Sequence, residues 1–351
     1  MRNKVTYPTP LRPGGTIGVC APSSGVEPGM FARLDNAIKN VRALGYDVIE
    51  SPSVRKNAKC VSANAPIRAS EFMSLWENPA VAAIIPPWGG EFLMDMLPCL
   101  DWERLAALPP KWLCGYSDTS TLCFALTTRL GVATLHGSNF MNLGFREIDH
   151  HGLRAFKAMS CEAFTQQSAS HYGRFRDRND LDGPVYTLDQ SSEWQLLEQN
   201  PQVSLACEGG GPKGRGEFSG RILGGCLDTI CKLVGTPYAP VPEFLRKYPG
   251  DNFIWAVESC EMSAADVYRT LWQMRQAGWF QRCAGVLVGR PDGYSDKQDF
   301  TLDDALRHIF ECPVLTGCDI GHIPPQLQLI NGARATVEYA GGRAAIHQEK
   351  T

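Results

Sequence analysis

A serine stands within residues 114–119, where a short apolar stretch meets a stretch with helical character. A hydroxyl at that junction lies at the carboxyl end of a strand and at the positive end of a helix dipole, where open α/β sheets bind ligands. Ser117 could therefore be a nucleophile, with the backbone N–H of Asp118 facing the oxyanion. The motif is incomplete, because Thr119 replaces the last glycine of G-x-S-x-G, and Ser117 or Asp118 could instead cap the helix.

A serine nucleophile needs a general base, and the base needs a group that orients it. His322 lies in a loop after a strand-like stretch, and two prolines stiffen that loop. His136, which ends an apolar stretch, is an alternative. The other five of the seven histidines lie in polar or surface stretches, and it is also open whether any histidine is catalytic.

Glu258 ends the nearly all-apolar stretch 253–257. Burying a carboxylate there without a partner would cost several kcal/mol, so we expect a partner such as a histidine or the following turn. Glu261 is the main rival, and we expect it to be exposed ahead of a helix. Gly89 and Gly90 could form an ordinary turn, or bring the backbone close to a substrate and offer a second oxyanion N–H.

The elements that would position these residues alternate along the first half of the chain. Apolar residues recur at helical spacing over 31–44, and Gly45 would end that helix. Further helices are predicted over 66–76 and 119–130, and strands over 16–21, 46–50, 81–85 and 113–116. Alternating strands and helices are typical of a parallel sheet covered on both faces. We expect an α/β, three-layer N-terminal domain over 1–165 that carries the nucleophile.

The second half of the chain has a different character. Residues 166–205 are polar and show little periodicity, so we interpret them as a linker or irregular segment. Residues 206–351 predict a C-terminal α+β domain that is rich in sheet and carries Glu258 and His322. Its helix over 264–277 begins with a capping pattern.

Composition excludes several classes of protein. The 351 residues are 44% hydrophobic and 20% charged, which is typical of folded domains, and their number suits two domains. A net charge of -3 argues against nucleic acid as a partner. No apolar run reaches the about 18 residues of a membrane span, and the first 15 residues lack the apolar part of a secretory signal. We therefore expect a cytoplasmic protein without a membrane partner.

The 13 cysteines are scattered and contain no CxxC pair. In a chain expected to stay in the cytoplasm, reduced thiols are the natural interpretation. Cysteine and histidine do not cluster at ligand spacing, so no metal and no other cofactor is expected.

Several motifs occur in an order that resembles the LD-carboxypeptidase and microcin C immunity family of serine peptidases. They are GYSDTS at 115–120, GRILGG at 220–225, WAVES at 255–259, GVLVGRP at 285–291 and DIGHIPPQLQLINGA at 319–333. The resemblance extends over most of the chain. It implies a homodimer whose active site lies between two domains and uses neither metal nor cofactor.

The resemblance also implies roles for individual residues. Ser117 would be the nucleophile, His322 the general base and Glu258 the acceptor that orients it. The backbone N–H groups of Gly90 and Asp118 would form the oxyanion hole. The implied activity is that of a serine carboxypeptidase that cleaves an amide at the carboxyl side of a small non-standard peptide. A non-catalytic binding protein on the same fold, or a broader amidase, are the alternatives.

Two branches of that family differ in substrate. One removes D-alanine from murein tetrapeptides, and the other cleaves peptidyl- or aminoacyl-nucleotide antibiotics. The stretch that starts at Glu258 looks closer to the second branch. Gly89 and Trp194 are then expected to bind substrate. Trp194 could stack on a nucleobase, and ordinary packing of its ring is the alternative. Leu188 stands where that branch often has a second aromatic residue, and the unusual stretch 84–88 indicates a pocket of different shape.

Overall fold

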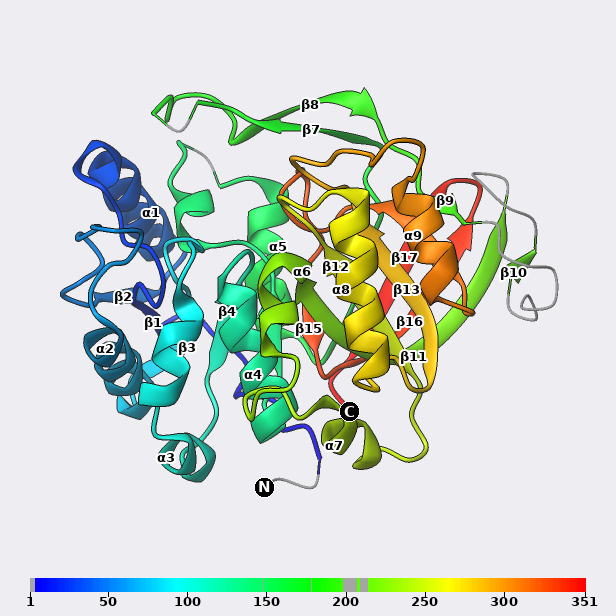
Figure 1. The fold of residues 1–351 in the computed structure, drawn as a ribbon. Coiled ribbons are helices and arrows are strands. Elements are labelled where there is room, and N and C mark those ends of the chain that lie inside the picture. Colours follow the sequence, from blue (N-terminus) through cyan, green and yellow to red (C-terminus); the bar gives the residue numbers. More distant parts are fainter. Residues whose placement is uncertain (1–3, 147, 178, 198–206, 209–213) are drawn as a thin grey trace.

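The computed structural model describes residues 4–146, 148–177, 179–197, 207–208 and 214–351. Two large sheets with their helices make up most of the protein, and a two-stranded hairpin lies across the top of both in the view of Figure 1. In this part of the chain, none of the helices combines the length and the apolar character that crossing a bilayer requires. The cysteines whose side chains are described form no disulfide.

The first sheet has the strand order β15-β5-β4-β3-β1-β2. Five of its strands are parallel and come from the first part of the chain, namely β1 (Thr16–Val19), β2 (Asp47–Glu50), β3 (Val81–Ile84), β4 (Trp112–Gly115) and β5 (Thr134–His136). The helices that alternate with them are α1 (Phe31–Ala43), α2 (Ala65–Glu77), α3 (Trp102–Ala107), α4 (Thr119–Leu130) and α5 (His150–Ser160), with 3₁₀ turns η1 (Pro28–Met30), η2 (Leu93–Cys99) and η3 (Phe140–Leu143). The predicted parallel α/β arrangement of the N-terminal part is confirmed.

The second sheet follows the order β6-β17-β16-β11-β12-β13-β14-β9. Its centre is parallel and consists of β11 (Arg215–Cys226), β12 (Phe253–Glu258), β13 (Cys283–Gly289) and β14 (Val314–Cys318). Antiparallel strands complete it, namely β6 (Ala163–Gln167), β9 (Gln195–Leu196), β10 (Cys207–Glu208), β16 (Arg334–Ala340) and β17 (Arg343–Glu349). Its helical elements are α6 (Leu227–Ile230), η4 (Cys231–Leu233), α7 (Val241–Arg246), α8 (Ala264–Gln276) and α9 (Leu302–Ile309). The predicted sheet-rich C-terminal part is confirmed.

The polar segment 166–205 contains regular structure that its composition did not indicate. It contains both hairpin strands, β7 (His171–Phe175) and β8 (Tyr186–Ser191), and strand β9, which joins the second sheet. β8 is exposed along nearly its whole length, so it lacks the apolar alternation by which a half-buried strand is predicted. The expected boundary at 205/206 lies outside the described residues.

The two sheets exchange strands and share a core. β15 (Leu329–Asn331), from the end of the chain, pairs antiparallel with β5 in the first sheet, whereas β6 belongs to the second sheet. Helix α4 contacts β4 and β5 on one side and β11 on the other (Figure 1). On α4, the Phe124 ring stacks on Trp279 at 5.1 Å between centroids and lies 6.1 Å from Trp255 of β12. A buried apolar interface therefore fixes α4 against the strand that ends in Glu258.

Candidate active site

Ser117 occupies the sharp turn between β4 and α4. Its φ is +61°, in the left-handed region that residues other than glycine rarely adopt. Such strain persists only where the surrounding structure imposes it, and it is found at functional sites. The residue at the N-cap position of α4 is Asp118, so Ser117 lies ahead of the helix and its hydroxyl is not the N-cap acceptor.

Gly89 and Gly90 follow β3, which neighbours β4 in the parallel sheet. The carboxyl ends of parallel neighbours meet at one edge, so the glycines reach the serine turn. A Cβ on Gly89 would lie 2.7 Å from the Ser117 Oγ, and one on Gly90 would lie 2.3 Å from the Ser24 Oγ. Gly90 also has a φ of +142°. Only glycine allows the backbone this close to the serine.

The Asp118 side chain stabilises the same turn through hydrogen bonds. Its carboxylate accepts hydrogen bonds from the Ser23 hydroxyl at 2.5 Å, the Leu93 N–H at 2.8 Å and the Thr121 hydroxyl at 3.1 Å. Burial raises the pKa of Asp118, although these three donors oppose that shift. The bonds tie together the loops after β1, β3 and β4, and so fix the peptide that carries the Asp118 N–H.

Glu258 and His322 meet at the matching edge of the second sheet. Glu258 ends β12 and is buried, and its Oε2 lies 2.8 Å from His322 Nδ1. Gly321 makes room for this contact, because a Cβ there would lie 2.4 Å from Glu258 Oε2, and its φ is +95°. Burial raises the pKa of Glu258, but His322, together with His136 and Cys226, lowers it, and the net shift is downward. The carboxylate is therefore ionised at neutral pH.

The pKa of His322 shifts in the opposite direction. Burial lowers the pKa of His322, but the Glu258 carboxylate raises it, and the net direction is upward from its ordinary value. The ring of Tyr116 packs edge-on against the imidazole at 5.1 Å between centroids. One nitrogen of His322 is thus committed to Glu258, while the residue itself lines a cavity.

The alternatives for base and acid lie elsewhere. His136 is buried, its Nδ1 is 3.3 Å from the Ser120 hydroxyl, and burial lowers its pKa to about 4. It does not line the cavity that contains Ser117 and His322, although it is close enough to Glu258 to affect the pKa of that residue. Glu261 is exposed ahead of α8, as predicted.

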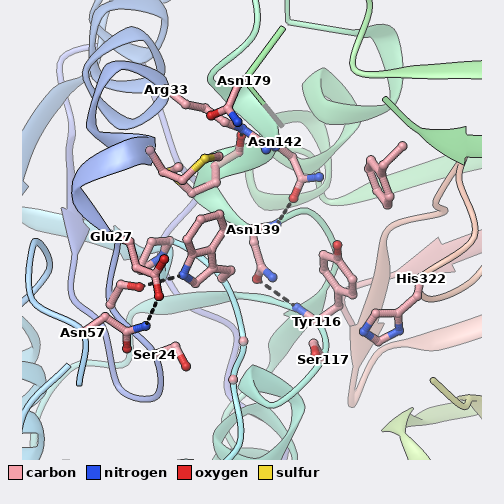
Figure 2. A pocket seen from close by; sticks show the side chains of 18 of the residues that line it. Ser24, Glu27, Arg33, Asn57, Tyr116, Ser117, Asn139, Asn142, Asn179 and His322 are labelled. Atoms are coloured by element: carbon pink, nitrogen blue, oxygen red, sulfur yellow. Dashed lines mark hydrogen bonds between the residues drawn. The ribbon is translucent and has the colours of Figure 1, made fainter. Parts of the chain in front are cut away.

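A cavity of about 860 Å³, here named the large cavity, opens onto both Ser117 and His322. Figure 2 shows Ser117, Tyr116 and His322 at one end of it, and Arg33 with Asn179 at the other. Side-chain amides line it, together with the aromatic residues Trp88, Tyr116, Phe145 and Phe175. The cavity thus offers both hydrogen-bonding groups and ring faces beside the serine.

Several of these lining residues were not predicted from the sequence. Phe175 and Asn179 belong to the hairpin region, whose sequence resembles a linker. Trp88 lies in the unusual stretch 84–88 that indicated a different pocket, and its indole N–H donates to the Gly25 carbonyl at 3.0 Å. Asn139, which accepts from the Tyr116 N–H at 3.2 Å, follows β5 on the next loop of the same sheet edge. The position of Asn139 directly after a buried strand was the signal in the sequence that could have indicated its place in the cavity.

The structure overturns the expectation for Trp194. Its side chain is fully buried in the core of the second sheet, and its indole N–H donates to Asp319 Oδ2 at 3.3 Å. Trp194 is absent from the lining of the large cavity. Its ring therefore has no face left for a nucleobase. Leu188, on the exposed strand β8, does not line that cavity either.

Two arginines that could have held a substrate carboxylate are also engaged within the protein. Arg290 pairs with Asp319 at 2.6 Å, with 11% and 1% of the two side chains exposed, and stacks on the Tyr172 ring at 4.5 Å. Arg68 donates to the carbonyls of Pro22 at 2.6 Å and Phe92 at 2.9 Å. Both guanidinium groups are therefore used to hold parts of the protein together.

The fold brings together three potential metal ligands that lie far apart in the sequence. Atoms of Cys226, Glu258 and His322 lie within 4.8 Å of one another. Burial raises the pKa of the Cys226 thiol well above its ordinary value, and Glu258 adds to that shift, so the thiol is protonated. Glu258 Oε2 and His322 Nδ1 are hydrogen-bonded to each other at 2.8 Å.

Comparison with known proteins identifies the class and then the family. The model of the LD-carboxypeptidase N-terminal domain matches residues 17–137, and that of the C-terminal domain matches residues 219–337. Together they cover well over half of the chain. The protein therefore belongs to the LD-carboxypeptidase family, and this membership supports a peptidase activity.

Relatives with known names span most of the chain. A protein of Vibrio cholerae named as a carboxypeptidase is 25% identical over 95% of each chain. The microcin C7 self-immunity protein MccF of Escherichia coli is 24% identical over 97% of this chain and 95% of its own. The murein tetrapeptide carboxypeptidase of Pseudomonas aeruginosa is 27% identical over 64% of this chain and 68% of its own.

The fold also resembles solved structures. MccF in complex with aspartyl sulfamoyl adenosine superimposes with a TM-score of 0.78 at 21% identity, and 99% of each chain is covered. At this identity, the likeness shows the fold.

The pair of Arg290 and Asp319 yields a prediction about the loop that carries His322. Asp319 is three residues before His322, and it also accepts from the Ala169 N–H at 2.7 Å. Replacing Asp319 by Ala leaves a buried guanidinium without its carboxylate, so we expect a loss of about 3–5 kcal/mol in the free energy of unfolding, measured by urea denaturation.

The control is Glu243→Ala, which removes an exposed ion pair to Arg246. It should change that free energy by at most about 1 kcal/mol. Equal effects of the two substitutions would contradict the role given to Asp319.

Proposed function

We propose that this protein is a serine carboxypeptidase in which Ser117, His322 and Glu258 form a catalytic triad. One observation carries the proposal: a serine held at a φ of +61° and a histidine hydrogen-bonded to a buried carboxylate line the same cavity. A pure binding protein would have no need for a strained serine beside an oriented imidazole. The family membership supports the same conclusion.

In the proposed mechanism, Ser117 Oγ attacks the carbonyl carbon of the scissile amide. His322 accepts the serine proton, and Glu258, bound to Nδ1, holds the ring and stabilises the imidazolium. The N–H groups of Gly90 and Asp118 would stabilise the oxyanion. His322 then donates the proton to the leaving nitrogen, and water hydrolyses the acyl-enzyme by the same steps in reverse order.

The proposed leaving group lies in the large cavity. The general acid must reach the leaving nitrogen, and His322 lines this cavity. Its volume of about 860 Å³ far exceeds the needs of one small amino acid. Asn57, Asn142 and Asn179, with the ring of Phe175, suit a nucleoside or a similarly polar and flat group.

The first candidate substrate is therefore a peptidyl- or aminoacyl-nucleotide, in keeping with the ligand of MccF named above. A murein tetrapeptide is the second candidate, favoured by the P. aeruginosa relative.

A direct test uses purified protein with aminoacyl-sulfamoyl adenosines and with a murein tetrapeptide, and identifies the products by mass spectrometry. Release of sulfamoyl adenosine supports the first candidate, and release of D-alanine supports the second. Failure to cleave either compound, together with no labelling of Ser117 by a fluorophosphonate, would leave the binding-protein alternative in place. Light scattering on the same sample tests the proposed homodimer.

The triad predicts a characteristic pattern of mutant rates. We expect Ser117→Ala, His322→Ala and Glu258→Ala each to lower kcat by orders of magnitude, because the three residues act as a unit, and double mutants should lose little more than the worst single mutant. Glu258→Gln should lose less than Glu258→Ala, because the amide can still accept a hydrogen bond from His322. Nearly full activity in Ser117→Ala would exclude the serine mechanism.

The Glu258–His322 pair also predicts the pH dependence. His322 must be neutral to accept a proton, and Glu258 shifts its pKa upward, so kcat/KM should rise with pH and reach half of its maximum above the ordinary histidine value of about 6.5. In Glu258→Gln the carboxylate is lost while burial remains, so the midpoint should move to lower pH. The profile is measured between pH 5 and 10, and a flat profile below pH 8 would contradict a histidine base.

Chelation provides another test. The proposed chemistry runs through Ser117 and His322, and Glu258 is bound to His322. We therefore expect kcat to be unchanged after dialysis against EDTA. Loss of activity that zinc restores would assign a metal to Cys226, Glu258 and His322 instead.

A further inference from the structure

Two cysteine thiols contact each other away from the candidate active site. The Sγ atoms of Cys283 and Cys312 are 3.3 Å apart, and the Cys312 thiol donates to Cys283. Neither residue lines the large cavity. A disulfide bond is about 2.05 Å long, so the two sulfurs would have to approach by about 1.2 Å to form one.

Backbone pairing holds the two cysteines side by side. Cys283 is the first residue of β13, and Cys312 lies two residues before β14, the parallel neighbour of β13. Val286 is opposite Val314 in this register, and its N–H donates to the Pro313 carbonyl at 2.9 Å. The ladder between the two strands thus extends to the residue next to Cys312. A following proline also restricts Cys312 to extended backbone.

Side chains fix the same two segments without involving the sulfurs. The rings of Phe280 and Phe310, a few residues before the two cysteines, pack edge-on at 4.9 Å between centroids. Arg282, directly before Cys283, donates to the Asp251 carbonyl at 2.7 Å. A thiol is only a weak hydrogen-bond donor, so these contacts, and not the bond between the thiols, keep the sulfurs together.

The pair of thiols is not part of a larger set of metal ligands. A structural zinc site uses four ligands, which are mostly cysteine and histidine. In the part of the chain that the structure describes, three potential ligands come together at Cys226, Glu258 and His322, and that group includes neither Cys283 nor Cys312. Two neighbouring thiols without further ligands are suited to oxidation to a disulfide.

The surroundings of the two thiols allow oxidation but make it slow at neutral pH. Both residues are partly exposed, so a small oxidant can reach them. The hydrogen bond from Cys312, together with burial, raises the pKa of Cys283 well above its ordinary value. Because the thiolate is the reactive form of cysteine, oxidation should become faster as the pH rises.

We propose that Cys283 and Cys312 form a reversible disulfide when the protein meets hydrogen peroxide. One sulfur attacks a peroxide oxygen, the O–O bond breaks, and a sulfenic acid forms while the released hydroxide takes the thiol proton and leaves as water. The other sulfur then attacks the sulfenic sulfur, the S–S bond forms, the S–O bond breaks, and a second water leaves. Two thiols and one peroxide thus give one disulfide and two waters, and a thiol reductant reverses the oxidation.

The disulfide would close a loop that contains β13 and α9. A crosslink between residues 29 positions apart restricts the unfolded chain, so the midpoint of thermal unfolding should rise by about 5 °C or more. The cysteines lie at the amino ends of β13 and β14, whereas the loop with His322 follows the carboxyl end of β14. The inference concerns stability and does not rest on the proposed function.

The test treats the purified protein with hydrogen peroxide and follows its intact mass, its proteolytic peptides and its thermal unfolding. We expect the loss of two hydrogen atoms in mass, a crosslinked peptide that contains Cys283 and Cys312, and a rise in the unfolding midpoint. Dithiothreitol should reverse all three changes. The crosslink should form faster at pH 9 than at pH 7.

Two variants separate this pair from other thiols. Cys99 is exposed on η2, so Cys99→Ala removes an accessible thiol from another site and should keep both the crosslink and the rise in midpoint. Cys312→Ala should lose both. Each variant is compared before and after peroxide, so a lower starting stability of Cys312→Ala does not affect the comparison.

Three outcomes would overturn the proposal. The first is oxidation of either cysteine to a sulfinic acid, or no oxidation, without a crosslinked peptide. The second is a crosslink that leaves the unfolding midpoint unchanged or lowers it. The third is a rise in midpoint that persists in Cys312→Ala.

Discussion

Several features of the second sheet accommodate the hydrogen bond between Glu258 and His322. A carboxylate at the end of an all-apolar strand is tolerated only with a partner, and His322 supplies one at 2.8 Å. The neighbouring backbone leaves room for it, since a Cβ on Gly289 would lie 2.8 Å from the Glu258 Cβ and one on Gly321 would meet its carboxylate. The buried pair of Arg290 and Asp319 then holds the loop on which His322 lies.

The candidate active site lies where the carboxyl edges of two parallel arrangements of strands meet. Ser117 and the two glycines come from neighbouring strands of the first sheet, and Glu258 and His322 from the ends of β12 and β14 in the second. Helix α4 links the two arrangements: it starts after Ser117, and its Ser120 hydroxyl accepts from the Cys226 N–H at 3.2 Å. The spacing between Ser117 and His322 thus depends on packing between the sheets.

The strained turn at Ser117 separates two cavities with different chemistry. The large cavity is rich in amides and aromatic rings and is lined by His322. The second cavity that Ser117 lines, of about 610 Å³, has the apolar side chains of Phe92 and Met94 and the carboxylate of Glu91. Proteins that share a fold can therefore differ in the ligand they accept, because the residues that line such cavities can change while the fold is kept.

Local signals in the sequence determined much of the fold. Apolar periodicity indicated α1, α2 and α4, and Ser263 with Asp266 forms the capping box that their spacing suggested. The strand-to-helix junction at Ser117 and the apolar strand ending in Glu258 were visible for the same reason, because buried elements have periodic or continuous apolar patterns. The family resemblance supplied the pairing of Glu258 with His322, which lie 64 residues apart.

Only the tertiary structure decided which residues surround Ser117, Glu258 and His322. Trp194, which the sequence offered as an aromatic ring for a substrate, lies in a core, and the charge of Arg290 is paired with that of Asp319. Phe175 reaches the large cavity from an exposed hairpin whose strands have no apolar alternation. Burial and long-range ion pairs depend on how distant segments pack, and a local pattern of residues contains no information about that packing.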